Sequence, residues 1–153
     1  MINEIDLKIL NLLQKDSSLS NAAIAKEIGL TASATFERIK KLEEKGIIKG
    51  YSLVLDPKKL DFSTLAFVFV QTDETLGNEA WEGLMKIPEV QEIHNVAGED
   101  CYLVKVRTKD TEALSLLLRK FLMIPLVRST RTTVVLETKK ETSYLPVEVI
   151  NKD

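Results

Sequence analysis

Apolar residues recur at helical spacing in three runs along the first 45 residues of the chain. The first run predicts a helix from Asn3, which can cap it, to about Lys15, because its apolar residues fall on one face. These residues are Ile5, Ile9, Leu12 and Leu13. The polar residues 16–18 then end the helix.

The second run predicts a short helix that Ser20 can cap. Its apolar positions Ile24, Ala25 and Ile28 lie on one face. Gly29 follows at once, and glycine readily adopts the left-handed conformation that commonly ends a helix. The chain therefore turns sharply after residue 28.

The third run predicts a helix that begins after Thr31, a second capping residue, and ends at Gly46. Phe36, Ile39 and Leu42 recur every three residues and should point inward. Small and polar residues are left for the outward face: Ser33, Ala34, Thr35, Glu37, Arg38, Lys40, Lys41 and Glu44. Residues 47–51 should start a strand of a basic hairpin.

Three helices and a hairpin within residues 1–50 are typical of a winged helix-turn-helix domain, whose third helix enters the major groove of DNA. We expect Ser33, Thr35 and Arg38 to read bases, Arg38 because a guanidinium bonds guanine through two hydrogen bonds. The residues that we expect to meet phosphates are Lys40, Lys41 and Lys49. A charged helix is also typical of an ordinary solvated surface. The agreement of caps, turn glycine, apolar spacing and hairpin favours DNA binding.

Residues 51–63 read as a linker between two domains. Residues 51–55 are β-prone, and Asp56-Pro57 stops that tendency. The polar stretch up to Ser63 then serves as a hinge, so that a second domain should span residues 64–153.

The second domain contains a repeat. Residues 65–90 align without a gap on residues 102–127, and Asp73, Ile87 and Pro88 then meet Asp110, Ile124 and Pro125. Each copy is an apolar strand, an Asp that can cap a helix, an amphipathic helix and an Ile-Pro stop, after which another strand begins. The order βαββαβ predicts a ferredoxin-like sandwich, and the whole chain is therefore expected to have an α+β fold.

The two copies are joined by a turn at residues 97–100, between expected strands at 90–97 and 101–108. The final strand, about 126–138, places Arg128, Thr130 and Thr132 on one face. A sheet that helices cover on one face only exposes apolar strands, which favours pairing with a second copy. A symmetric dimer would present two reading helices to a near-palindromic DNA site.

Composition narrows the class of protein. The 153 residues can form one or two modest cores, and the net charge of −2 does not favour indiscriminate nucleic-acid binding. A single cysteine excludes an internal disulfide framework. The N-terminus is not organised like a signal peptide, and no apolar stretch approaches the ~18 residues of a membrane span. We expect a cytoplasmic protein without a membrane partner, metal site or cofactor.

Three stretches together resemble the Lrp/AsnC, or feast/famine, family of transcriptional regulators. They are DLKILNLLQKDSSLSNAAIAKEIGLTASATFERIKKLEEKGIIKGYSLVLDPKKL, VAGEDCYLVKVRT and RTTVVLETKKETSYLPV. The resemblance covers nearly the whole chain. It implies a winged helix-turn-helix, a β-linker and a βαββαβ domain that dimerises, with dimers that assemble into tetramers or octamers. It also implies an amino acid or related metabolite as effector.

In this family the effector binds where two dimers meet, near the loop between the second and third strands of the second domain. Carried onto this chain, the resemblance implies the effector residues Gly98, Glu99, Asp100 and Cys101, with Arg128, Thr130 and Thr132 nearby. Many members have an Asp before Tyr102, where this chain has Cys101, and a thiol cannot meet an ammonium group by charge. Glu99 or Asp100 would have to take that role. Members often have Ser-Pro where this chain has Thr31-Ala32, which still provides a cap.

Two other functions remain as alternatives. Siroheme decarboxylases resemble the same family, but the one histidine, His94, has no histidine or tyrosine cluster around it in the sequence. No phosphate loop, paired-Cys metal site or nucleophile elbow is present, so we predict no catalytic residues. The other alternative is a ligand-sensing module that no longer binds DNA, since Glu37, Glu43 and Glu44 partly offset the basic residues.

Overall fold

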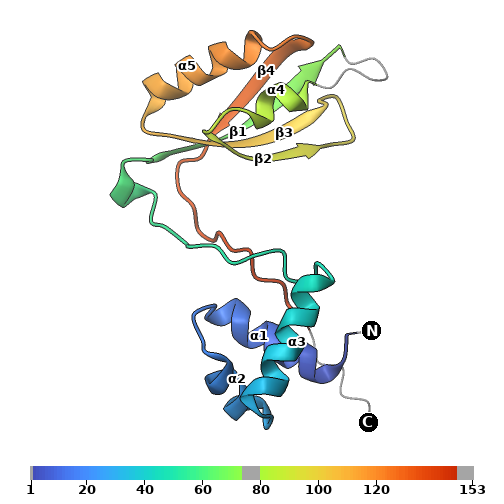
Figure 1. Cartoon of the computed structure of the whole chain (residues 1–153). Coiled ribbons are helices and arrows are strands. Elements are labelled where there is room, and N and C mark those ends of the chain that lie inside the picture. The colour runs from blue at the N-terminus through green and yellow to red at the C-terminus, as the bar shows by residue number, and fades with distance from the viewer. Residues whose placement is uncertain (1, 74–79, 148–153) are drawn as a thin grey trace. The chain divides into compact units, whose positions relative to one another are not determined.

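The computed structural model describes residues 2–73 and 80–147 (Figure 1). The chain separates into two compact units. The first contains the described residues up to Val54 together with residues 141–147, and the second spans Leu55–Lys140. The final described residues therefore group with the first unit, although the expected domain boundary placed them in the second.

The first unit is built from three helices, α1 (Glu4–Lys15), α2 (Asn21–Ile28) and α3 (Ala32–Glu44). The predicted caps are present. Asn3 and Asp6 exchange side-chain to backbone hydrogen bonds at the start of α1. The side chains of Ser20 and Thr31 accept from the third N–H groups of α2 and α3, and Gly29 ends α2 with φ of 73°.

The core of the first unit is small, because it contains four buried aliphatic residues contributed by all three helices: Ile9, Ile24, Ile39 and Leu42. Two predictions about α3 were wrong. Thr35, expected to face outward, is fully buried, and its Oγ1 donates to the Thr31 carbonyl at 3.0 Å. Phe36, expected to face inward, is 50% exposed. The buried stripe keeps Ile39 and Leu42 as predicted, but its first position is Thr35 instead of Phe36, and this threonine satisfies its hydroxyl within its own helix.

The strand expected from residue 47 is also not formed. Residues 46–63, all described, contain a short 3₁₀ helix at Lys58–Leu60 and no strand. Leu53 and Val54 are 82% and 90% exposed. A strand is defined by a ladder partner, and this β-prone segment has none within the described chain.

The second unit is a four-stranded antiparallel sheet in the order β2-β3-β1-β4. Its strands are β1 (Thr64–Thr72), β2 (Val90–Asn95), β3 (Tyr102–Thr108) and β4 (Val127–Val134). The helices α4 (Trp81–Met85) and α5 (Thr111–Leu122) lie on the same face of this sheet (Figure 1). The predicted ferredoxin-like arrangement is confirmed.

The main core lies between this sheet and its two helices. It joins alternate residues of β1 and β3 to Leu84 of α4 and to Leu117 and Phe121 of α5. The packing is tight where the helices end, because a Cβ on Gly83 would lie 2.7 Å from Cγ2 of Ile124. The repeated Ile-Pro stops are confirmed by helices that end just before them, at Met85 and Leu122.

Two aspartates of the repeat, Asp73 and Asp110, were predicted to cap helices, and the structure describes the helix start at only one of them. Asp110 caps α5 by accepting from the N–H of Ala113 at 2.7 Å. The helix start predicted after Asp73 falls on residues 74–79, which lie outside the described residues. The final strand is shorter than predicted, since β4 ends at Val134.

Candidate DNA-binding surface and effector site

The cationic side chains predicted to meet phosphates are exposed in the first unit. Lys40 and Lys41 lie on α3 and Lys49 lies in the segment that follows it. Lys40 is 3.9 Å from Glu44, one turn further along the helix, a distance at which the attraction in water is weak. Ser33, predicted to read bases, is exposed in the first turn of α3. These four side chains are accessible to a duplex.

Arg38 lies differently from the other predicted base readers. Its guanidinium donates to Oδ1 of Asp6 at 2.8 Å and to Oδ1 of Asn3 at 3.4 Å. The Asp6 side chain is 12% exposed and that of Arg38 31%. Arg38 therefore ties α3 to the cap of α1, a contact between residues 32 positions apart. The first turn of α1 contains two acidic residues, Glu4 and Asp6, and only the fold shows which of them meets Arg38.

Tyr51 holds the chain beside the end of α3. Its hydroxyl donates to Oε1 of Glu43 at 2.9 Å. Partial burial, followed by the hydrogen bond and charge of Glu43, raises the pKa of Tyr51 to about 12. The hydroxyl is therefore protonated at any physiological pH and remains a donor to the carboxylate.

In the second unit, the loop between β2 and β3 contains the four residues predicted to bind the effector. Asp100 accepts from Nη2 of Arg131 at 2.7 Å. The Arg131 guanidinium also lies over the ring of Phe69, 4.1 Å from its centroid. The Glu99 carbonyl accepts from the amide of Gln71 at 3.4 Å, and Gln71 in turn accepts from the hydroxyl of Ser129 at 2.8 Å.

Gln71, Ser129 and Arg131 were missed by the sequence reasoning. Gln71 lies on β1, and Ser129 and Arg131 lie on β4. Phe69 pairs with Arg131 and Gln71 pairs with Ser129, so all of these side chains point to the face of the sheet that the helices do not cover. The alternation of residues along β4 could have indicated this placement, because it puts Ser129 and Arg131 on one face of the strand.

The predicted residues of β4 are not all brought to the loop. Thr130 and Thr132 pair with Val70 and Val68, which are buried under the helices, so these threonines lie on the opposite face from Arg131. Arg128 is 3.9 Å from Asp73 in an exposed ion pair. The register shift between Gln71 and Thr72 sets Arg128 apart from the regular alternation.

Cys101 is half-buried and packs against the main core. Its N–H donates to the Val70 carbonyl at 3.0 Å, and its sulfur lies 3.9 Å from the Thr72 carbonyl oxygen. Gly98 has φ of 155° with open space around its Cα. The backbone N–H of Cys101 thus anchors one end of the loop to β1, while Asp100 supplies a negative charge to the loop.

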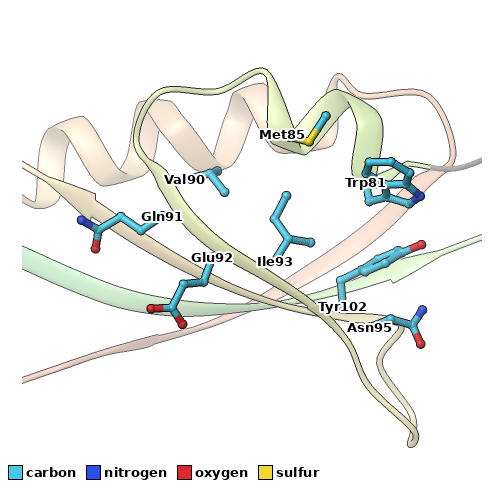
Figure 2. A pocket seen from close by; sticks show the side chains of 8 residues that line it. All are labelled: Trp81, Met85, Val90, Gln91, Glu92, Ile93, Asn95 and Tyr102. Carbon is cyan, nitrogen blue, oxygen red and sulfur yellow. The ribbon is translucent and has the colours of Figure 1, made fainter. Parts of the chain in front are cut away.

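A groove of about 720 Å³ lies on the other side of the loop, between α4 and the edge strand β2. Figure 2 shows Trp81 and Met85 of α4 above Ile93 of β2, with Asn95 and Tyr102 at one end. Because Asn95 and Tyr102 flank residues 96–101, this end of the groove adjoins the predicted effector loop. Its lining combines apolar side chains with the amides of Gln91 and Asn95 and the carboxylate of Glu92, and small-molecule sites commonly pair apolar walls with a few polar groups.

The helix-free face also carries an ion-paired cluster on β2 and β3. Glu92 accepts from Lys105 at 3.0 Å and lies 3.2 Å from His94. The hydrogen bond from Lys105, and then that with His94, lowers the pKa of Glu92. His94 is therefore an exposed partner of a carboxylate.

Within the described ranges, no three His, Cys, Asp or Glu side chains are grouped so that they could hold a metal ion. In the same ranges, no helix has the length and apolar character needed to cross a membrane.

Comparison with known families accounts for both units. Residues 2–49 match the winged helix-turn-helix DNA-binding family, and residues 65–145 match the Lrp/AsnC ligand binding domain. The chain belongs to the Lrp/AsnC family. It is a DNA-binding transcriptional regulator of that type, with the reading domain first and the ligand-binding domain second.

Curated Lrp/AsnC relatives match over almost their full length. The HTH-type transcriptional regulator FL11 of Pyrococcus horikoshii is 40% identical over 147 residues, covering 96% of this chain and 97% of FL11. The leucine-responsive regulatory protein of Escherichia coli K12 is 37% identical, covering 96% of this chain and 92% of that protein.

Solved Lrp/AsnC structures have the same fold. A feast or famine regulatory protein from M. tuberculosis, complexed with L-methionine, has a TM-score of 0.89 and 29% identity, covering 95% of this chain and 99% of that one. A regulator from Neisseria meningitidis, also in complex with L-methionine, has a TM-score of 0.86 and 29% identity, covering 95% and 97%.

Proposed function

We propose that this regulator binds a near-palindromic operator as a homodimer or higher assembly, in the cytoplasm, and that an amino acid bound to its second domain changes its affinity for DNA. The observation that carries the proposal is the pairing, in one chain, of a helix-turn-helix domain that exposes Lys40 and Lys41 on α3 with an Lrp/AsnC ligand-binding domain. Linkage requires that the effector bind the competing assembly states with different affinity.

For DNA contact we propose Ser33 at base edges and Lys40, Lys41 and Lys49 at phosphates. Thr35 is withdrawn from the proposed set because its side chain is buried and its hydroxyl is bonded within α3. Arg38 can read guanine only by leaving Asp6, so its first role is to fix the angle between α3 and α1.

For self-association we propose the helix-free face of the sheet. Phe67 and Phe69 of β1 lie there beside Leu103 of β3, all partly exposed, and the ion pair of Glu92 with Lys105 lies at the β2 side of this apolar strip. Sedimentation velocity of the wild type against Phe67→Lys tests this surface, because Phe67 lies opposite Lys105 and a second buried cation beside it is costly. The variant should sediment as a monomer, and an unchanged oligomer would exclude this face.

For the effector we propose the polar cluster of Asp100, Arg131, Gln71 and Ser129. An amino acid carries an ammonium and a carboxylate, and Asp100 and Arg131 offer one group of each opposite charge. The L-methionine complexes of the two related structures support an amino acid as the chemical class. With Cys101 unable to supply a charge, Asp100 is the proposed ammonium partner.

The test is a thermal-shift screen of the standard amino acids, followed by gel shifts on the upstream DNA with and without each hit. A ligand that binds the folded state raises the unfolding midpoint. Asp100→Asn should abolish the shift, whereas Trp81→Ala, in the groove of Figure 2, should leave it. The reverse result would move the effector to the groove. No shift with any amino acid, together with DNA binding that ignores sequence, would overturn the proposal.

We also propose that the protein has no enzymatic activity. His94 is 56% exposed on its strand and bonded to Glu92, an arrangement that supports no tetrapyrrole chemistry. Incubation with siroheme, followed by chromatography of the product, tests this alternative. Any turnover would contradict the proposal.

A further inference from the structure

The C-terminal segment Tyr144–Val147 is held on α1 of the first unit by two side-chain amides. Gln14 donates from Nε2 to the Leu145 carbonyl at 3.0 Å and accepts the Leu145 N–H at 2.7 Å. Asn11 donates from Nδ2 to the Val147 carbonyl at 3.0 Å and accepts from the Tyr144 hydroxyl at 3.2 Å. Four hydrogen bonds thus join positions 131 to 136 residues apart in the chain.

The contact is polar in character. The Gln14 amide meets both backbone groups of one residue, as a neighbouring strand would. Leu145 is 66% exposed and Tyr144 42%, so little apolar surface is removed from water. Segments held mainly by exposed hydrogen bonds belong to the least stable parts of a fold and open readily. This segment is therefore suited to docking and release.

The segment continues directly from the strand that contacts the effector loop. Arg131 of β4 bonds Asp100, and the N–H of Val135 still donates to the Leu65 carbonyl of β1. Between residue 135, held by the sheet, and residue 144, held by α1, the chain spans about 30 Å at most. The polypeptide crosses between the two units at Val54/Leu55 and again at Lys140/Glu141, so docking turns a single tether into two.

We propose that α1 carries a docking site for the C-terminal segment of its own chain, formed by Asn11 and Gln14, and that this second tether transmits the effector signal from β4 to the DNA-reading domain. The transmission rests on the proposed function above, whereas the docking rests on the hydrogen bonds alone. Effector binding that draws Arg131 from Asp100 shifts β4, and the docked segment passes that shift to α1. When the segment is released from α1, effector binding to the second unit no longer changes the DNA-reading domain.

The docking is tested by hydrogen exchange of the full-length protein. The Leu145 amide should be protected in the wild type and should exchange at the rate of an unstructured chain in the double variant Asn11→Ala/Gln14→Ala. Lys15→Ala, an exposed position on the same helix, is the matched control and should retain the protection. Equal, fast exchange at Leu145 in all three proteins would overturn the docking.

The transmission is tested by the ratio of operator affinities with and without an equimolar mixture of the standard amino acids. The double variant should bind the operator as tightly as the wild type when the mixture is absent, because Asn11 and Gln14 lie outside the proposed DNA surface. Its affinity ratio should fall toward one. A chain that ends at Lys140 removes the segment without altering α1 and should behave the same way.

An affinity ratio equal to that of the wild type, in a variant whose Leu145 amide exchanges freely, would overturn the transmission. A wild-type ratio of one would overturn the proposed function and the transmission with it. Protection of Leu145 would still support docking in that case, so the two failures are distinguishable.

Discussion

The proposed phosphate-binding lysines and the proposed effector cluster present their charges in opposite ways. On the DNA-reading domain, Lys41 and Lys49 extend from the surface of α3 and the segment after it, and the nearest acid to Lys40 is 3.9 Å away. On the ligand-binding domain, charges meet inside the protein's own network. Asp100 bonds Arg131 at 2.7 Å, and Glu92 bonds Lys105 at 3.0 Å.

This difference suits the two partners. Exposed lysines displace the cations condensed around the phosphates of a duplex, and no bond within the protein has to be broken. At the proposed effector loop, a small zwitterion would have to compete with the Asp100–Arg131 pair. Binding there therefore exchanges one set of contacts for another, which is the requirement for a ligand that changes conformation. The following substitutions break or sharpen the comparison, from the largest expected effect to the smallest.

Removal of a core side chain should have the largest effect, because it should unfold one domain and leave the other folded. Ile24 is fully buried in the four-residue core of the first unit, and Ile24→Ala should cost about 2–5 kcal/mol of folding free energy. The reading domain should lose its dispersed NMR signals and DNA binding, while the sheet remains folded. Leu117→Ala in the second core is the control and should have the reverse effect. Simultaneous loss of both sets of signals would show one cooperative unit.

Asp6→Ala removes both the ion pair with Arg38 and the hydrogen bond that Asp6 accepts from the Asn3 N–H at the start of α1. The variant leaves a partly buried guanidinium without its carboxylate, and we expect a loss of about 1–3 kcal/mol in urea unfolding. Glu4→Ala removes an exposed pair with Lys8 on the same helix and should cost well under half of that. Unchanged stability with altered base preference at one operator position would instead make Arg38 a base reader.

Lys41→Ala should weaken operator binding several-fold at physiological salt, and the slope of log affinity against log salt should fall by about one. Lys49→Ala should behave alike. The control is Lys86→Ala, an exposed lysine that follows α4 in the other domain, which should change neither quantity. Filter binding at four salt concentrations measures both. A loss of affinity with an unchanged slope would contradict phosphate contact.

The smallest effect concerns pH. Because Lys105 and His94 lower the pKa of Glu92 in the folded state, their interaction stabilises the fold above the unfolded value of 4.5. That stability is lost as the pH falls through the depressed folded pKa. Glu92→Gln should therefore unfold more easily than the wild type at pH 7, with the difference narrowing by pH 3. Glu27→Gln, exposed on α2, should show no such trend.

Local signals in the sequence predicted the helices of the reading domain well. Asn3, Ser20 and Thr31 each cap a helix, and Gly29 ends one, because these interactions involve residues within one turn. The burial of Thr35 was not predicted, since a threonine that bonds its own helix can occupy an apolar position. The order of strands and helices along the second domain was predictable from the repeat.

The effector site at residues 98–101 stays a prediction. The sequence did not indicate the hydrogen-bond partners of this loop, Gln71 and Arg131, because they depend on the register between β1 and β4. A shift of one residue moves every side chain to the other face, and the register is set by pairing across more than 50 residues. The docking of residue 145 on residue 14 had no local signal, because a side-chain amide that binds backbone leaves no pattern in the partner's sequence.

That recognition of backbone has a consequence for how the protein can vary. Gln14 contacts the N–H and C=O of Leu145, groups that every residue except proline presents in the same form. The side chain at position 145 can therefore change to any residue except proline and keep this attachment, provided that α1 retains the Gln14 amide. Position 144 is constrained differently, because the Tyr144 hydroxyl donates to Asn11.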